Sequence, residues 1–303
     1  MLEMRARTQI QQNLFLSACL SDTFQPKLWQ AGVICKKGFF MNEKLRKILI
    51  VVCLLVVSFT GYQIASSFYE IYNMKKESDK LIAEIKKNTD DDSQNNEDEQ
   101  GWFVPDANTY PFLKALNDDY QGWLIWDSNL ISTPILQSKS DSEYYLDHNV
   151  YRNYVIGGSA FIAPETSLDS QNITMYGHSV FVTNSQTTGQ MFSNLRVLED
   201  QSAYENNKTF KIYWKDHVDS YEVYAVCETN VSTDQWSYEQ SNFDNADEFN
   251  TWIGYANNHN YISPDIEADF NDKYVTFQTC KYKEGDDRII VIAKKIGERS
   301  YDN

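Results

Sequence analysis

Residues 209–226 read TFKIYWKDHVDSYEVYAV, and this stretch decides the fold class. Apolar and polar side chains alternate on both sides of the polar residues Asp216–Asp219. Alternation with a period of two is typical of a β-strand with one buried face, and two such runs around a short turn predict an antiparallel hairpin. Tyr, Val, Ile and Phe dominate both runs, as they do on pleated, half-buried surfaces.

Similar runs occur before and after this hairpin. We predict eight strands: Gln121–Trp126, Thr133–Leu136, Val155–Ile162, Ile173–His178, Thr209–Lys215, Ser220–Glu228, Tyr274–Cys280 and Arg288–Ile296. Eight short strands at these spacings favour a closed barrel, because closure leaves no unpaired sheet edge. Before the first strand, Thr109 and Pro111 resemble the start of a short helix. The expected fold is therefore mainly β, an eight-stranded barrel preceded by helices.

Two helical interruptions are expected within the barrel. Gly189–Leu195 is interpreted as a short helical turn. Residues 232–272 form a long insertion between the sixth and seventh strands, and insertions of this length are usually functional. Within it, Asn245–Asn258 is predicted to be an amphipathic helix, because apolar residues recur at positions i, i+3, i+4 and i+7. Those residues are Phe249, Trp252, Ile253 and Ala256.

A run of 22 residues without a charge, Ile48–Tyr69, predicts a transmembrane helix. Three cations precede the run and Glu70 follows it, which places the N-terminus in the cytoplasm and the rest of the chain outside. The alternatives are a buried core helix and a cleaved signal peptide. Because no A-x-A-like cleavage site follows the run, we expect a retained anchor.

Charge divides the chain at the same place. The 303 residues carry a net charge of −16, but residues 1–68 carry +5 and the remainder −21. An acidic balance argues against nucleic acid as a partner, since nucleic-acid binding needs clustered Lys and Arg. The length allows one or two domains with a full hydrophobic core.

The chain is expected to have four segments. They are a doubtful extension (1–40), a cytoplasmic end and anchor (41–69), an extracellular helix and acidic linker (70–101), and a folded domain (102–303). Met41 opens a normal short export-signal start, so translation is hypothesised to begin there. Calcium binding by Asp90, Asp91 and Asp92 is disfavoured, because the linker lacks ligand alternation and the EF-hand glycine. No metal or cofactor is expected.

Two cysteines lie beyond the membrane segment, Cys227 and Cys280. Exported proteins use cysteine mainly in disulfides, so a Cys227–Cys280 bridge is one interpretation. Cys227 alternates with apolar residues on one strand face and is typical of a small core residue. Cys280 ends a strand and opens the loop KYKEGDD, where a thiol is exposed enough to act as a nucleophile.

A nucleophilic thiol needs a proton partner, and His178 is the leading candidate general acid/base. It lies in the stretch ITMYGHS, directly after Gly177, which permits close backbone approach. A strand-end histidine alone is more often structural. The other three histidines, His148, His217 and His259, lie in polar loops and are expected to be solvated.

Arg288 is the third candidate, eight residues after Cys280 at the start of RIIVIAKK. If the two strands form an antiparallel hairpin, Arg288 returns beside Cys280. A guanidinium there stabilises a developing oxyanion or a thiolate. The alternative is a salt bridge from Arg288 to Asp286 or Asp287.

These residues together resemble the sortase family. TFQTC at 276–280 is similar to the sortase TLxTC signature, with Phe277 in place of Leu, and YGHS at 176–179 is similar to the histidine motif. Arg288 matches the family arginine. PILQSKSDSEYYLDHN at 134–149 and GQMFSNL at 189–195 extend the resemblance over about residues 102–297. The anchor, the helices before the barrel and the helix-containing insertion resemble class B.

The resemblance implies a cysteine transpeptidase. Cys280 would attack the carbonyl of a Thr in a C-terminal sorting signal, His178 would protonate the leaving amine, and Arg288 would hold the carbonyl or its oxyanion. The acceptor would be an amine of the cell-wall peptide or of its lipid-linked precursor, in a Gram-positive cell. The insertion would form one wall of the signal groove. Gln278 and Thr279 would contact the signal, unless they serve backbone packing.

Three other functions remain open from the sequence. A cysteine endopeptidase would use Cys280 and His178 with water in place of the amine. A pilus-assembling sortase is disfavoured by the class B-like insertion. A tethered binding or sensor barrel would leave Cys280 without a chemical role.

Overall fold

The computed structural model describes residues 42–89, 97–98, 100–181, 184–185 and 187–301. It contains two compact units, residues 1–60 and 61–303, which are described separately. The predicted extension 1–40 and the acidic residues 90–92 lie outside the described residues. The four predicted segment boundaries stay predictions.

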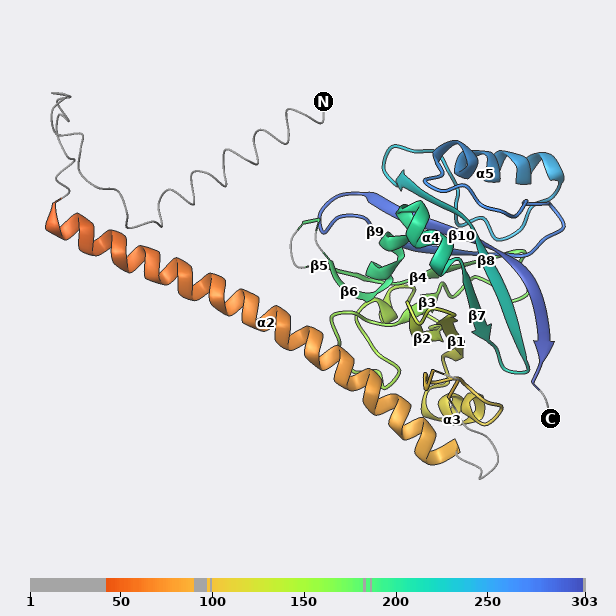
Figure 1. Cartoon of the computed structure of the whole chain (residues 1–303), viewed down its shortest axis with the longest axis horizontal. Coiled ribbons are helices and arrows are strands. Elements are labelled where there is room, and N and C mark those ends of the chain that lie inside the picture. Colours follow the sequence, from red (N-terminus) through yellow and green to blue (C-terminus); the bar gives the residue numbers. More distant parts are fainter. Residues whose placement is uncertain (1–41, 90–96, 99, 182–183, 186, 302–303) are drawn as a thin grey trace, which may run out of the picture. The chain divides into compact units, whose positions relative to one another are not determined.

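The second unit contains a closed barrel of eight strands (Figure 1). The strands are β1 (Tyr120–Trp126), β2 (Ser132–Leu136), β3 (Ala160–Ile162), β4 (Asn172–Tyr176), β7 (Thr209–Tyr213), β8 (His217–Asn230), β9 (Tyr274–Cys280) and β10 (Asp287–Ser300). Their order around the barrel is β1-β2-β3-β4-β9-β10-β8-β7. The β2–β3 and β4–β9 pairs are parallel and the other pairs are antiparallel. The predicted eight-stranded barrel is confirmed.

Large apolar side chains fill the barrel interior. Phe277, the residue that departs from the sortase signature, is fully buried there. Its ring centroid lies 5.2 Å from that of Phe210, 5.4 Å from that of Trp126 and 5.6 Å from that of Phe192. The phenyl ring therefore serves packing behind the strand that carries Cys280.

Five strand predictions were wrong by two or more residues at an end. The eighth strand continues to Ser300 rather than ending at Ile296, because β10 pairs with β8 as far as Ser300 and His217. The third strand begins at Ala160, because residues 155–158 turn through Gly158 at φ +53°, where a Cβ would lie 2.2 Å from the Leu146 carbonyl oxygen. The fourth strand ends at Tyr176 rather than at His178. In the hairpin the turn comes earlier than predicted, since the Trp214 N–H donates to the His217 carbonyl at 2.9 Å.

The predicted helical turn at Gly189–Leu195 was wrong in its first half. β5 (Ser179–Phe181) and β6 (Thr187–Met191) form a separate two-stranded sheet. Met191 has φ +52°, and only after it do η2 (Phe192–Glu199) and α4 (Gln201–Asn207) begin. Pairing of Met191 with Ser179 outweighs the local helical pattern.

Two layers cover separate parts of the outer barrel face. The first layer contains α3 (Thr109–Leu116), η1 (Tyr144–Leu146) and the C-terminal part of α2 (Glu43–Thr89). Leu81 and Ile85 are 5% and 0% exposed, and the Tyr151 hydroxyl donates to Glu84 at 2.6 Å. The helix predicted within the segment 70–101 is thereby found as the C-terminal part of α2.

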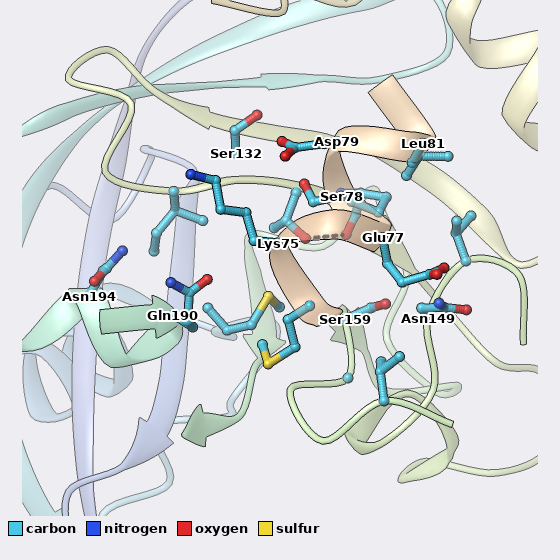
Figure 2. Close-up of a pocket in the computed structure, with 18 of the residues that line it drawn as sticks. Lys75, Glu77, Ser78, Asp79, Leu81, Ser132, Asn149, Ser159, Gln190 and Asn194 are labelled. Atoms are coloured by element: carbon cyan, nitrogen blue, oxygen red, sulfur yellow. Dashed lines mark hydrogen bonds between the residues drawn. The ribbon is translucent and has the colours of Figure 1, made fainter. Parts of the chain in front are cut away.

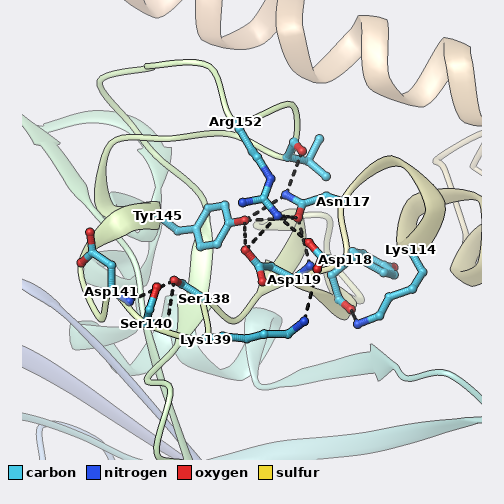
Figure 3. Close-up of polar contacts among 12 residues, drawn as sticks. Lys114, Asn117, Asp118, Asp119, Ser138, Lys139, Ser140, Asp141, Tyr145 and Arg152 are labelled. Atoms are coloured by element: carbon cyan, nitrogen blue, oxygen red, sulfur yellow. Dashed lines mark hydrogen bonds and ion pairs between the residues drawn. The ribbon is translucent and has the colours of Figure 1, made fainter.

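A polar network fixes the first layer to β1 (Figure 3). Arg152 donates to Asp118 at 2.6 Å and to Asn117 at 3.0 Å, and it forms an ion pair with Asp119 at 3.2 Å. The Tyr145 hydroxyl donates to Asp119 at 2.7 Å. Because Asn117 and Asp119 are buried, these hydrogen bonds satisfy groups that would otherwise be costly.

The second layer is the insertion 232–272, with α5 (Ala246–His259) over β8 and β10 (Figure 1). The Asn245 side chain accepts from the Glu248 N–H at 3.0 Å, which caps the helix. All four residues predicted for its apolar face are buried, at 5% exposed or less: Phe249, Trp252, Ile253 and Ala256. This prediction is confirmed.

Candidate active site

Strand register brings the predicted catalytic residues to one end of the sheet. Cys280 is the last residue of β9, and it pairs directly with Arg288 of β10. In the next strand Thr229 of β8 pairs with Arg288. On the other side, Tyr176 of β4 pairs with Gln278, and His178 follows two residues later. The expected hairpin thus places Arg288 beside Cys280.

Cys280 faces the outside of the barrel. Paired residues on neighbouring strands point to the same face, and so do residues two apart in one strand. Cys227 lies two residues before Thr229 in β8, and Ile290 lies two residues after Arg288 in β10. Both pack in the outer hydrophobic cluster beneath α5. Cys280 and Arg288 therefore project on the face that carries the insertion, whereas Phe277 projects inward.

His178 is held in place through its neighbour Gly177. The Thr279 hydroxyl donates to the Gly177 carbonyl at 2.8 Å, and the Gly177 N–H donates to the Gln278 carbonyl at 3.3 Å. A Cβ on Gly177 would lie 2.5 Å from the Phe192 ring, so this position requires glycine. Burial lowers the pKa of His178, and the charge of Asp147 partly opposes that change.

Thr279 is 1% exposed, and its hydroxyl is used by the backbone that precedes His178. We assign it to positioning of the histidine, the second of the two roles that the sequence left open. Gln278 is half-buried on the outer face. Its role in binding the signal stays a prediction.

Cys227 and Cys280 are both free thiols. Cys227 and Gln278 flank Ile290 from β8 and β9, so they are two strand spacings apart. The Cα atoms of Cys227 and Gln278 are thus about 10 Å apart, and Cys280 lies two residues further along β9. This separation exceeds the Cα–Cα distance that a disulfide spans. The structure therefore does not support the alternative of a Cys227–Cys280 bridge.

Arg288 is not paired with the carboxylates of Asp286 or Asp287 before it. Its guanidinium donates to the carbonyls of Gly285 at 3.1 Å and Asp287 at 3.2 Å. The Asp287 carboxylate accepts from Asn230, and the Asp286 carboxylate accepts from Ser232. Within the part of the chain that the structure describes, Arg288 forms no ion pair. Its positive charge is therefore not neutralised beside Cys280, with which it pairs.

Lys281, the residue after the cysteine, is engaged elsewhere. Its ammonium group forms an ion pair with Glu228 and lies 3.3 Å from the Tyr261 hydroxyl. Burial works to lower the pKa of Lys281, but these two partners outweigh burial and raise it. Lys281 therefore adds no unpaired positive charge beside the thiol.

The fold of this chain is similar to that of solved structures of sortase B. The structure of Clostridium perfringens sortase B is 27% identical over 62% of this chain and 100% of that chain, with a TM-score of 0.56. A Staphylococcus aureus sortase B–substrate complex is 26% identical over 62% and 84%, with a TM-score of 0.55. Sortase B complexed with triglycine is 25% identical over 62% and 86%, with a TM-score of 0.55. No protein-family model matches the chain, and neither does any curated protein sequence.

The chain has a sortase fold of the class B type. In this sortase fold the row of His178, Cys280 and Arg288 lies at one end of the sheet, and all three residues are partly buried. The insertion borders it through the Tyr176 hydroxyl, which donates to Glu239 at 2.9 Å.

Two residues beside this candidate site were not predicted from the sequence. Tyr238 of the insertion is 8% exposed, and its phenol lies in the fields of both Arg288 and Cys280. Burial and Glu239 raise its pKa. Asp147 acts on His178 from a segment 31 positions earlier. Neither belongs to a regular strand or helix, so no periodicity marks it.

The cavities described in this sortase fold lie outside the row. One of about 220 Å³ separates residues 74–81 of α2 from β2 and β6 (Figure 2). Another lies beside the only described group with metal-ligand geometry, His217, Asp219 and Glu298. There the Lys295 ammonium lies 2.7 Å from Asp219 and 2.6 Å from Glu298, so a lysine already supplies the positive charge.

Proposed function

We propose that this chain is a membrane-anchored, class B-like sortase. It would cleave a C-terminal sorting signal after Thr and transfer the acyl group to an amine of the cell-wall peptide or its lipid-linked precursor, attaching surface proteins to peptidoglycan. The observation that carries this proposal is the strand register that brings His178, Cys280 and Arg288 to one end of the sheet, where all three are only partly buried.

The chemistry follows from the row. The Cys280 sulfur bonds to the Thr carbonyl carbon while the peptide C–N bond breaks, and His178 delivers a proton to the leaving amine. Arg288 donates to the oxygen on which negative charge develops. In the second half-reaction the acceptor amine forms the new C–N bond and gives a proton to His178, while the C–S bond breaks and the thiolate is regenerated.

The partners are proposed from similar proteins and from chemistry. Similar sortase B structures are described with a substrate and with triglycine, which supports a peptide donor and a peptide amine acceptor here. The choice of cell-wall peptide or lipid-linked precursor, and the sorting signal itself, belong to the proposal. No cofactor is needed, because thiol, imidazole and guanidinium supply each step.

Membrane attachment is proposed through residues 48–69. The described residues contain one helix that is long and apolar enough to cross a membrane, and large apolar side chains within it are exposed. Lys44, Arg46 and Lys47 before the run place the N-terminus in the cytoplasm and the barrel outside the cell.

The test is product analysis with the full-length chain in detergent micelles. A library of sorting-signal peptides is incubated with and without triglycine, and products are identified by mass spectrometry. We expect cleavage after Thr and a product that carries triglycine. Hydrolysis alone, at all triglycine concentrations, would identify an endopeptidase instead.

A chain that neither forms a thioacyl adduct nor cleaves any peptide would contradict both enzyme functions and favour the binding barrel. The matched control is Cys280→Ala, which removes only the sulfur.

A further inference from the structure

We propose that Arg196 is a positioning residue for the candidate active site, and this inference rests on the proposed function. Arg196 lies on the 3₁₀-helix η2, which follows β6. Its guanidinium binds the backbone that follows Cys280, and a serine one turn earlier binds the backbone that follows His178. One element of the barrel therefore fixes where both side chains stand.

The two sides of η2 repeat every three residues. In a 3₁₀-helix residues i and i+3 lie on the same side, because one turn contains three residues. One side is apolar, 0% exposed and part of the barrel core, and its residues are Phe192, Leu195 and Leu198. The next side is polar, and its residues are Ser193, Arg196 and Glu199. The apolar side holds η2 in the core, so the polar side contacts its neighbours from a fixed position.

The first contacts of η2 are to the chain around His178. The Ser193 hydroxyl accepts from the Val180 N–H at 2.9 Å, two residues after the histidine. Because Ser193 and Val180 are both buried, this hydrogen bond satisfies an N–H that would be costly to leave unpaired. Before the histidine, the Phe192 ring packs so closely on Gly177 that a Cβ there would lie 2.5 Å from it. η2 thus fixes the backbone on both sides of His178.

Arg196 makes the corresponding contact to the chain after Cys280. A single guanidinium nitrogen, Nη1, donates to the Lys281 carbonyl at 3.1 Å and to the Ser185 carbonyl at 2.9 Å. Lys281 directly follows Cys280, and Ser185 lies between β5, which begins directly after His178, and β6. The guanidinium therefore joins the two segments through which the chain leaves the row.

Asn184 adds a second connection between the same two segments. Its carbonyl accepts from the Lys283 N–H at 3.0 Å, and its side-chain oxygen accepts from the Glu284 N–H at 3.1 Å. The loop after Cys280 is thus bound at residue 281 by Arg196 and at residues 283–284 by Asn184.

The position of Arg196 matters because β9 ends at Cys280. Beyond it the Lys281 N–H still donates to the Asp287 carbonyl at 3.0 Å, but residues 281–286 belong to no strand. A reacting group displaced by about 1 Å can lose about 10²-fold in rate. Arg196 therefore acts through the backbone on the Cys280 thiol, whereas Arg288 is proposed to act on the oxyanion.

The experiment compares Arg196→Met with Arg196→Lys in the full-length chain in micelles. Met keeps the length of the stem without any donor, whereas Lys keeps a donor and the charge. Arg299→Met, exposed near the end of β10, is the matched control. Cleavage of one sorting-signal peptide gives kcat and KM. Alkylation of Cys280 by iodoacetamide is followed across pH by mass spectrometry of the peptide that contains it.

We expect Arg196→Met to lower kcat about 10-fold to 100-fold with little change in KM, because the thiol is displaced while the peptide still binds. Arg196→Lys should recover part of kcat, since an ammonium donates to a carbonyl but lacks the planar fork. In Arg196→Met the alkylation of Cys280 should move to higher pH, because a thiolate farther from the His178 imidazolium is less stabilised. Arg299→Met should match the unaltered chain.

Unchanged kcat in a folded Arg196→Met chain would overturn the assignment, and so would a rise in KM with kcat unchanged. If Arg196→Met does not fold, Asn184→Ala decides, because Asn184 is exposed and the change removes only the acceptor for the Glu284 N–H. It should lower kcat severalfold with KM unchanged, and an unaltered kcat would count against the assignment. Absence of any thioacyl adduct in the unaltered chain would instead remove the proposed function itself.

Discussion

Cys280 and Cys227 carry the same thiol group, but they differ in how far other residues bury it. Both project on the outer face of the barrel, from the strands on either side of β10. Cys227 lies beneath α5, is 0% exposed, and burial raises its pKa to about 12. Cys280 ends its strand beyond that layer and is partly exposed. Burial beneath α5 keeps the Cys227 thiol protonated and away from solvent, whereas solvent reaches the Cys280 thiol.

The largest expected effect separates the two cysteines directly. Cys280→Ala should abolish both thioacyl formation and peptide cleavage while the fold persists, because the nucleophile is removed. Cys227→Ala should keep activity and lower the free energy of unfolding by about 1 kcal/mol, since it removes one small buried group. Mass spectrometry of the adduct and denaturant unfolding check both, and cleavage by the Cys280 variant would contradict the assignment.

The second expected effect concerns the two residues that are proposed to act together with the Cys280 thiol. His178→Ala should lower turnover about 10²–10⁴-fold by removing the proton donor, and Arg288→Ala about 10²–10³-fold by removing the oxyanion donor. Arg288→Lys should recover only part of the loss, since an ammonium lacks the planar fork. Steady-state cleavage rates measure this, with circular dichroism to show that each variant folds.

The third prediction concerns α5, the helix that covers Cys227. Trp252 is 3% exposed and packs on Phe243 and Tyr274, with ring centroids 5.0 and 5.9 Å away. Trp252→Ala should cost about 3–5 kcal/mol of unfolding free energy and make Cys227 react with iodoacetamide. Asn250→Ala, on the exposed side of the same helix, is the control. Unchanged alkylation of Cys227 in a destabilised Trp252→Ala chain would show that α5 is not its cover.

The smallest expected effect concerns the charge beside the histidine. Asp147 favours the imidazolium and thereby opposes the lowering of the His178 pKa by burial. Asp147→Asn should therefore lower the His178 pKa further, reduce the imidazolium fraction near pH 7, and slow the proton-donation step severalfold. An NMR titration of His178 measures the pKa, and the limb of the pH–rate profile that reports this imidazolium should move to lower pH. Asp141→Asn, exposed on the same segment, should change neither.

Much of the fold could be predicted because it depends on neighbouring residues. The strand Tyr274–Cys280 has the predicted bounds, and all four predicted residues of the α5 face are buried. Both results follow from local periodicity, which the side-chain pattern carries directly. The β5–β6 hairpin and the short third strand could not be predicted, because they depend on pairing with Met191 and on the turn at Gly158.

The sequence by itself determined the residue types of the site and their spacing. The sequence contains a strand-end thiol, a histidine after a glycine, and an arginine eight residues after the thiol. That last spacing predicts a hairpin that pairs Cys280 with Arg288. Which of these groups can react or bind depends on the tertiary structure. Thr279 turns inward to hold Gly177, Cys227 is covered, and Lys281 is bound by Glu228. Cover and ion pairing come from segments distant in sequence, and local periodicity carries no information about them.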